Sequence, residues 1–157
     1  MPLEMENTFV LQPSNLDIER VVGYTDKFKI NDYDLLTVGD GGIYSSASDL
    51  FKWTEALNNG EFISEESLAT LYDPVTLTSG RKRRYGYGWE IGNNSNGKLV
   101  YHSGELSGFR TYLERQLEEE STIIILTNNS FEEIGELRNT LVKVMDGRLN
   151  EVPEIKD

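Results

Sequence analysis

The sequence predicts an α+β domain in which an antiparallel sheet of about four strands forms a meander. Two short helices precede the sheet, and a C-terminal helix packs on one of its faces. Apolar residues recur at helical spacing before residue 75, alternate with a period of two over residues 85–91, and return to helical spacing after residue 130. At 157 residues the chain is long enough for one substantial core, so we expect a single domain over residues 1–157.

The first third of the chain contains an irregular lead-in and then a clear helix. Residues 1–40 lack sustained periodicity, apart from a short amphipathic stretch over residues 15–22 that could be helical. In the helical segment over residues 41–75, Ser46 and Asp49 have the spacing of a capping box. An apolar face follows, made of Leu50, Trp53 and Leu57.

Two further helices are predicted from their start signals. Ser64 is a suitable N-cap for a helix that reaches about Tyr72, where the following Asp73-Pro74 pair ends it. The C-terminal helix is predicted over residues 130–146, because Ser130 and Glu133 have capping-box spacing and precede one apolar stripe. The stripe consists of Ile134, Leu137, Leu141 and Met145. Residues 147–157 form a polar tail.

The sheet is predicted between residues 85 and 127. Its expected strands are residues 85–91, 98–102, 109–117 and 121–127. Turn residues separate the first two strands, and the acidic run Glu118–Glu120 separates the last two. The last strand, Ser121–Thr127, is an apolar run without proline and would lie at a sheet edge.

Composition excludes several classes of partner and chemistry. A net charge of −12 disfavours nucleic acid, and the one basic cluster, Arg81–Trp89, is expected to be a solvated loop. No apolar run approaches the roughly 20 residues of a membrane span. Without cysteine and with a single histidine, neither a zinc site nor another metal site or cofactor is expected. The N-terminal segment lacks the pattern of a secretory signal, so we expect no targeting signal within the residues given, and a processed or truncated product would look the same.

The single histidine lies where a strand ends, in the tripeptide His102-Ser103-Gly104. Spacing alone is a weak catalytic signal here, because a histidine at a strand end is more often a surface residue than a catalyst. Both interpretations stay open on this evidence.

Five stretches of the chain together resemble a known family. They are "PLEMENTFV" (residues 2–10), "GGIYSSASDLFKW" (residues 41–53), "YGYGWEI" (residues 85–91), "HSGELSGF" (residues 102–109) and "IIILTNN" (residues 123–129). In this order they resemble the C-terminal part of the serine β-lactamase and penicillin-binding protein superfamily, in its class C β-lactamase-like branch. The resemblance implies a partial β-lactamase-like fold and a parent protein that is periplasmic, extracellular or membrane-anchored.

The resemblance also implies a mechanism and roles for four residues. In the family, a serine activated by a lysine one helical turn later is acylated and then hydrolysed with help from a tyrosine. His102 would be the cationic or hydrogen-bonding residue, Ser103 a hydroxyl that contacts substrate, and Gly104 the residue that lets the ligand approach the backbone. The backbone N–H of Glu105 would be one of two oxyanion-hole donors.

The nucleophile is expected to be absent from this chain. The family's Ser-x-x-Lys and Tyr-x-Asn motifs precede the segment that matches Pro2, and none of the eight tyrosines is followed by asparagine two places on. Ser-x-x-Lys occurs twice, from Ser79 to Lys82 and from Ser95 to Lys98, but with glycine inside the motif and in predicted turns. The side chain of Glu105 also departs from the family pattern, since a carboxylate there would disfavour a substrate carboxylate.

We therefore interpret the chain as the C-terminal part of a class C-like serine hydrolase that is inactive alone. The class includes β-lactamases, D-alanyl-D-alanine carboxypeptidases and esterases, so a small-molecule or peptidoglycan-like acyl substrate is implied for the complete enzyme. One alternative is a binding module that kept the pocket edge without the chemistry, and another is an unrelated acidic α+β domain. The edge strand Ser121–Thr127 is expected to pair with a second copy or with an N-terminal half.

Overall fold

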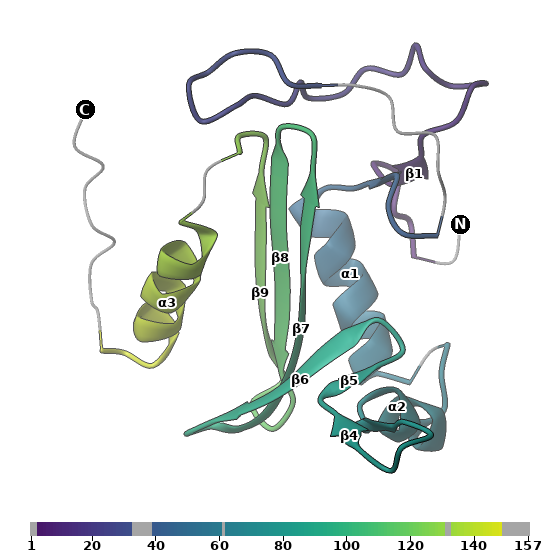
Figure 1. Cartoon of the computed structure of the whole chain (residues 1–157), viewed down its shortest axis with the longest axis vertical. Coiled ribbons are helices and arrows are strands. Elements are labelled where there is room, and N and C mark those ends of the chain that lie inside the picture. The colour runs from purple at the N-terminus through teal and green to yellow at the C-terminus, as the bar shows by residue number, and fades with distance from the viewer. Residues whose placement is uncertain (1–2, 33–38, 61, 131–132, 149–157) are drawn as a thin grey trace.

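The computed structural model describes residues 3–32, 39–60, 62–130 and 133–148. Its main element is a five-stranded antiparallel sheet in the order β5-β6-β7-β8-β9. The strands are β5 (Tyr85–Gly86), β6 (Trp89–Asn94), β7 (Gly97–Leu106), β8 (Phe109–Gln116) and β9 (Ser121–Thr127). Helix α1 (Ala47–Asn58) and helix α3 (Ile134–Met145) lie on opposite sides of the sheet (Figure 1). The predicted α+β class with an antiparallel meander is confirmed.

The sheet gains its fifth strand because one predicted strand is a hairpin. The alternation over residues 85–91 indicated a continuous strand, but Tyr87 and Gly88 have positive φ angles of 49° and 87° and reverse the chain. Gly86 therefore pairs with Trp89, and the two sides of the turn differ in burial. Trp89 is 7% exposed, whereas Tyr87 is 73% exposed, so the alternating aromatic residues of this segment do not share one buried face.

The two helices before the sheet begin where their N-caps predicted. The backbone N–H of Asp49 donates to the Ser46 hydroxyl (3.2 Å) at the start of α1. The N–H of Ser67 donates to the Ser64 hydroxyl (3.3 Å) at the start of α2 (Glu65–Leu71). Both contacts satisfy N–H groups that a helix leaves unpaired at its first turn.

Helix α3 begins four residues later than predicted. It starts at Ile134, and Glu133 at its N-cap makes no side-chain capping bond. The hydroxyl of Ser130 instead donates to the Ser107 carbonyl (3.4 Å), because Ser130 still belongs to the connection that follows β9. Of the predicted polar tail, residues 149–157 lie outside the described part of the chain.

The core between α1, α2 and the sheet is aromatic. Its buried members are Leu57, Tyr72, Trp89, Ile91 and Val100. The indole of Trp89 stacks on that of Trp53 (5.9 Å between ring centroids, 7° between planes) and meets the Tyr72 ring edge-on at 6.0 Å. These contacts hold both helices against the first strands of the sheet.

The opposite face of the sheet is held to α3 by a buried ion pair. Glu114 on β8 is fully buried, and its carboxylate accepts bonds from Arg138 Nε (2.8 Å) and Nη2 (2.7 Å). The Tyr112 hydroxyl and the Gln116 amide also donate to this carboxylate, each at 2.6 Å. Each carboxylate oxygen of Glu114 thus accepts two hydrogen bonds. A buried charge is tolerated when it is paired and hydrogen-bonded in this way.

The N-terminal lead-in lies against α1 and the end of the sheet. Strand β1 (Phe9–Val10) pairs with β2 (Ile43–Tyr44), and the Thr8 hydroxyl donates to the buried Asp49 carboxylate (2.9 Å). Asp49 thus binds Thr8 instead of completing the predicted capping box. No helix forms over residues 15–22, which run as turns and extended chain. A separate hairpin of β3 (Val75–Thr76) and β4 (Lys82–Arg83) follows α2.

Candidate active site

The four residues singled out by the sequence lie together on β7. His102 and Gly104 pair with Leu113 and Thr111 of β8, whereas Ser103 and Glu105 pair with Tyr112 and Arg110. Because side chains alternate along a strand, the imidazole of His102 faces the α1 side and the side chains of Ser103 and Glu105 face the α3 side. The motif thus places an imidazole on one face of the sheet and a hydroxyl and a carboxylate on the other.

The edge of β7 is unpaired beyond Tyr101. The N–H of Leu117 donates to the Lys98 carbonyl (3.0 Å), so even-numbered residues of β7 direct their peptide groups to β8. The odd-numbered residues of β7 direct their peptide N–H and C=O groups toward β6. The pairing of β6 with β7 ends at Tyr101. Within the part of the chain that the structure describes, the N–H and C=O groups of Ser103 and Glu105 therefore face an open strand edge. Among the described residues, none accepts a hydrogen bond from the Glu105 N–H.

His102 is oriented by two polar contacts. Its Nδ1 lies 2.6 Å from the Ser103 carbonyl and its Nε2 lies 3.2 Å from the Tyr85 hydroxyl. A carbonyl only accepts, so Nδ1 carries a proton, and in the neutral ring Nε2 accepts from Tyr85. The Tyr85 ring meets the imidazole edge-on at 5.9 Å between centroids. Both nitrogens are thus held on the open side of the strand.

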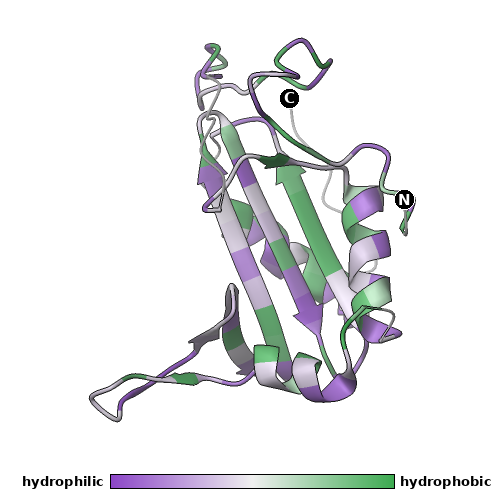
Figure 2. Cartoon of the chain, turned by 90° about the vertical axis from the view of Figure 1, so that its right-hand side faces the viewer, coloured by the Kyte–Doolittle hydropathy of each residue, from purple (hydrophilic) through white to green (hydrophobic). Residues whose placement is uncertain are grey.

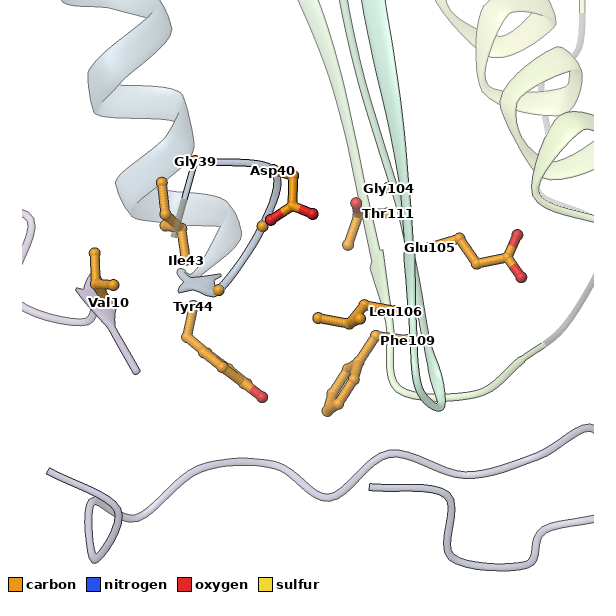
Figure 3. A pocket seen from close by; sticks show the side chains of 12 residues that line it. Val10, Gly39, Asp40, Ile43, Tyr44, Gly104, Glu105, Leu106, Phe109 and Thr111 are labelled. Atoms are coloured by element: carbon orange, nitrogen blue, oxygen red, sulfur yellow. The ribbon is translucent and has the colours of Figure 1, made fainter. Parts of the chain in front are cut away.

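A cavity of about 540 Å³ opens beside this edge, between β7 and the loop that leads into β2 (Figure 3). Gly104, Glu105 and Leu106 line one wall, and residues 39–44 line the other. Figure 3 shows the Asp40 carboxylate directed into the space between the two walls. A second hollow of about 790 Å³ continues past His102 to the start of α1 and shares Asp40, Gly104 and Thr111 with the first.

The Glu105 side chain is turned away from this cavity. Its carboxylate forms an ion pair with Arg110 Nη2 (2.6 Å) on the α3 side of the sheet, and Figure 3 shows it pointing away from Asp40. The expectation that this carboxylate would face an acyl pocket and repel a substrate carboxylate is therefore wrong. Strand alternation is the reason, since only the backbone of Glu105 reaches the cavity wall.

Gly104 leaves room for close approach to the backbone. A Cβ atom at this position would lie 2.4 Å from the Thr111 hydroxyl oxygen of the neighbouring strand. A larger residue would thus displace Thr111 and fill space on the cavity side of β7. A glycine in a strand often marks such a position.

The two Ser-x-x-Lys matches lie in turns and outside both hollows. Ser79 belongs to the turn between β3 and β4, and Ser95 belongs to the turn between β6 and β7. Lys98 forms an ion pair with Asp73 (3.9 Å) instead of facing a serine. Neither pair is on a helix, where the serine and the lysine would share a face. Among the described residues, no group of three or more His, Asp or Glu side chains could hold a metal ion.

Sequence reasoning missed Asp40 and Tyr85. Asp40 has no periodic signal, because it lies in a loop whose position depends on the pairing of β1 with β2. Tyr85 falls within the strand predicted over residues 85–91, and the turn at residues 87–88 brings its hydroxyl to His102. The Gly41-Gly42 pair that precedes β2 was the available signal for this loop, since Gly42 has a φ of 82°.

Comparison with solved structures assigns this arrangement, a sheet between two helices with a His-Ser-Gly strand beside a cavity, to the fold of β-lactamases and penicillin-binding proteins. The structure superimposes on an octameric penicillin-binding protein homologue from Pyrococcus abyssi with a TM-score of 0.75 at 22% identity, covering 93% of this chain and 35% of that one. It superimposes on a class C beta-lactamase with a TM-score of 0.68 at 14% identity, covering 98% and 49% of the two chains.

The sequence places the chain within this class. The Beta-lactamase family model matches residues 1–144, and the chain belongs to this family. Penicillin-binding protein 4* of Bacillus subtilis (strain 168) is 34% identical over 152 residues. That match covers 94% of this chain and 31% of the relative, so the chain spans about a third of the relative's length.

Proposed function

We propose that this chain supplies one wall of the acyl site of a β-lactamase-type serine hydrolase, as the C-terminal portion of its catalytic domain. His102 is the hydrogen-bonding or cationic residue, and Gly104 admits the acyl group. Ser103 contacts substrate through its backbone at the strand edge, because its hydroxyl lies on the α3 side of the sheet. The Glu105 N–H is an oxyanion-hole donor. The observation that carries the proposal is the unpaired edge of β7, where this N–H opens beside a cavity.

The nucleophile is supplied from outside these residues, so the chain alone is catalytically inactive. Support comes from the turn positions of Ser79 and Ser95 and from the uncovered apolar surface of the first third of the chain. Half of the exposed large hydrophobic side chains belong to residues 10–51. They are Val10, Leu16, Ile18, Val21, Val22, Phe28, Ile30, Ile43 and Phe51. An apolar surface of this kind is typical of an interface.

The chain alone is expected to form no covalent adduct with a fluorescent penicillin or an activated ester. Gel fluorescence after incubation measures this directly, with the Ser79→Ala and Ser95→Ala variants beside the unaltered chain. Labelling that disappears in either variant would show that the chain carries its own nucleophile and would overturn this part of the proposal.

A chimera tests the role of Glu105. This chain replaces the 152 matched residues of the Bacillus subtilis penicillin-binding protein, and acylation by fluorescent penicillin is followed over time. Glu105→Pro is expected to lower the acylation rate by about 10²–10³-fold, because it removes the N–H donor. Since that N–H faces the open edge, proline removes no bond between β7 and β8.

The matched control is Glu105→Ala, which keeps the N–H and removes only a carboxylate that faces Arg110. Its acylation rate should stay within about threefold of that of the chimera. Equal rates for the proline and alanine variants would contradict the oxyanion-hole assignment, provided that both chimeras keep the same circular dichroism spectrum.

The free edge of β9 is proposed as the surface for a second copy of the chain or for the remaining half of the domain. The Tyr24 N–H donates to the Asn128 carbonyl (2.8 Å) on the outer side of this edge, so even-numbered residues direct their peptide groups outward. Thr122, Ile124 and Leu126 follow this pattern on a strand whose central residues, 123–126, are apolar (Figure 2).

Self-association of the chain should depend on this edge. Sedimentation velocity over a range of concentrations is expected to show dimers for the unaltered chain and monomers for Ile124→Lys, because a charge on an edge strand opposes pairing. Circular dichroism of the variant controls for folding. A monomer at every concentration for both proteins would contradict pairing between copies and leave the other half of the domain as the partner.

A further inference from the structure

The hairpin of β3 and β4 projects from the body of the protein, as Figure 2 shows. Val75 pairs with Arg83 and Thr76 with Lys82. The turn is closed by the Leu77 N–H, which donates to the Arg81 carbonyl (3.0 Å). Because paired residues share a face, Val75, Leu77, Arg81 and Arg83 lie on one face of the hairpin.

Four consecutive cations on this hairpin lack carboxylate partners. Arg81, Lys82, Arg83 and Arg84 are all exposed. None of them forms an ion pair with the residues that the structure describes, in a chain whose net charge is −12. The protein thus carries its most concentrated positive charge along one side of a projecting hairpin, from its turn to its base.

Aliphatic side chains accompany the arginines. Val75 is 45% exposed and Leu77 is 40% exposed, and both lie on the face that carries Arg81 and Arg83. An isolated exposed aliphatic residue is ordinary. Two of them beside two guanidinium groups make a surface that is both apolar and cationic.

We propose that this hairpin binds the surface of an anionic phospholipid bilayer. The guanidinium groups would contact lipid phosphates, and Val75 and Leu77 would enter the boundary between headgroups and acyl chains. A bilayer accepts both components at once. A nucleic-acid backbone offers phosphates without an apolar layer, and would therefore use only the cations.

The attachment of the hairpin explains why binding would matter for the candidate site. Arg84 is followed directly by Tyr85, whose hydroxyl contacts His102. The base of the hairpin is also held in place by a close backbone contact between Gly86 and Asp73. A Cβ atom at Gly86 would lie only 2.6 Å from the Asp73 carbonyl oxygen. A bilayer bound by the hairpin would therefore hold β7 at a defined distance from the membrane surface.

Flotation of the full chain with vesicles tests the proposal. Vesicles of phosphatidylcholine with about 30% phosphatidylglycerol should bind the chain at low salt, and phosphatidylcholine alone should not. Arg81→Gln with Arg83→Gln is expected to lower the partition coefficient by about 25-fold, at about fivefold per cation. Val75→Ser with Leu77→Ser should lower it by about tenfold.

The matched control is Lys27→Gln with Lys29→Gln, which makes the same change in net charge on a loop that carries the exposed Phe28 and Ile30. This control should bind vesicles like the unaltered chain. Three results would overturn the proposal: no binding to anionic vesicles, an equal loss in the lysine control, or no effect of the serine substitutions together with displacement by short duplex DNA. The last result would identify a general polyanion site. None of these measurements depends on acylation.

Discussion

Replacing Arg138 by methionine is expected to lower the free energy of unfolding by about 3–5 kcal/mol, because the change leaves Glu114 buried without its partner. Arg138 makes two bonds to this carboxylate, at 2.8 and 2.7 Å, and the carboxylate has no access to solvent. The loss should be measured by urea denaturation at neutral pH.

Two further variants separate this ion pair from a general effect of arginine. Arg148 pairs with Asp146, but its side chain is 62% exposed, so Arg148→Met should cost less than about 1 kcal/mol. The double variant Glu114→Gln with Arg138→Met should recover part of the loss, because no buried charge remains. A double variant that is less stable than Arg138→Met alone would contradict the argument.

The Glu114–Arg138 pair predicts that the unaltered chain and Arg138→Met respond in opposite directions when the pH is lowered, as measured by the free energy of unfolding. Burial alone would raise the pKa of Glu114, but hydrogen bonds from Arg138 and Tyr112 and the Arg138 charge lower it below its ordinary value of 4.5. Its stabilising contribution is therefore complete above pH 4.5 and is lost as the pH falls through the depressed pKa. In Arg138→Met only burial and neutral donors remain, so that variant should instead gain stability as the pH falls from 7 toward 5. A parallel decline in both proteins over this range would show that Arg138 does not control the Glu114 carboxyl.

Replacing Trp89 by alanine should have an effect of similar size. We expect a loss of about 3–5 kcal/mol, because the indole is 7% exposed and fills the space between Trp53 and Tyr72. Urea denaturation followed by circular dichroism measures the loss without relying on tryptophan fluorescence.

Tyr87 provides the matched control, since it lies two residues away and is 73% exposed. Tyr87→Ala should change the free energy of unfolding by less than about 0.5 kcal/mol. If Trp89→Ala were equally mild, the aromatic cluster would not be the core that joins α1 and α2 to the sheet.

Much of the fold could be predicted because local signals and tertiary structure agree. Ser46 and Ser64 cap helices that pack on the sheet, and the continuous apolar run in β9 matches a sheet with helices on both faces. The predictions are wrong where a side chain that was expected to form a local contact binds a distant residue instead, or where the backbone turns. Asp49 is bound by Thr8, Ser130 bonds to Ser107, and positive φ angles at Tyr87 and Gly88 convert an alternating run into a hairpin.

Only part of the candidate site could be predicted from the sequence. The tripeptide that begins at His102 could be found from local pattern and family resemblance, because it is contiguous. Asp40 could not, since its loop reaches β7 only through the pairing of β1 with β2. The orientation of the Glu105 carboxylate depends on strand parity, which a motif comparison does not consider.

The pairing of the lead-in with the end of β9 has a consequence for the order of folding. The Asn128 side chain donates to the Val22 carbonyl, a contact between residues 106 positions apart in the chain. The hairpins of the sheet close over far shorter separations, and closing a long loop costs more chain entropy before any contact forms. We therefore expect the lead-in to join a sheet that has already formed, a step that also brings the Asp40 loop beside the edge of β7.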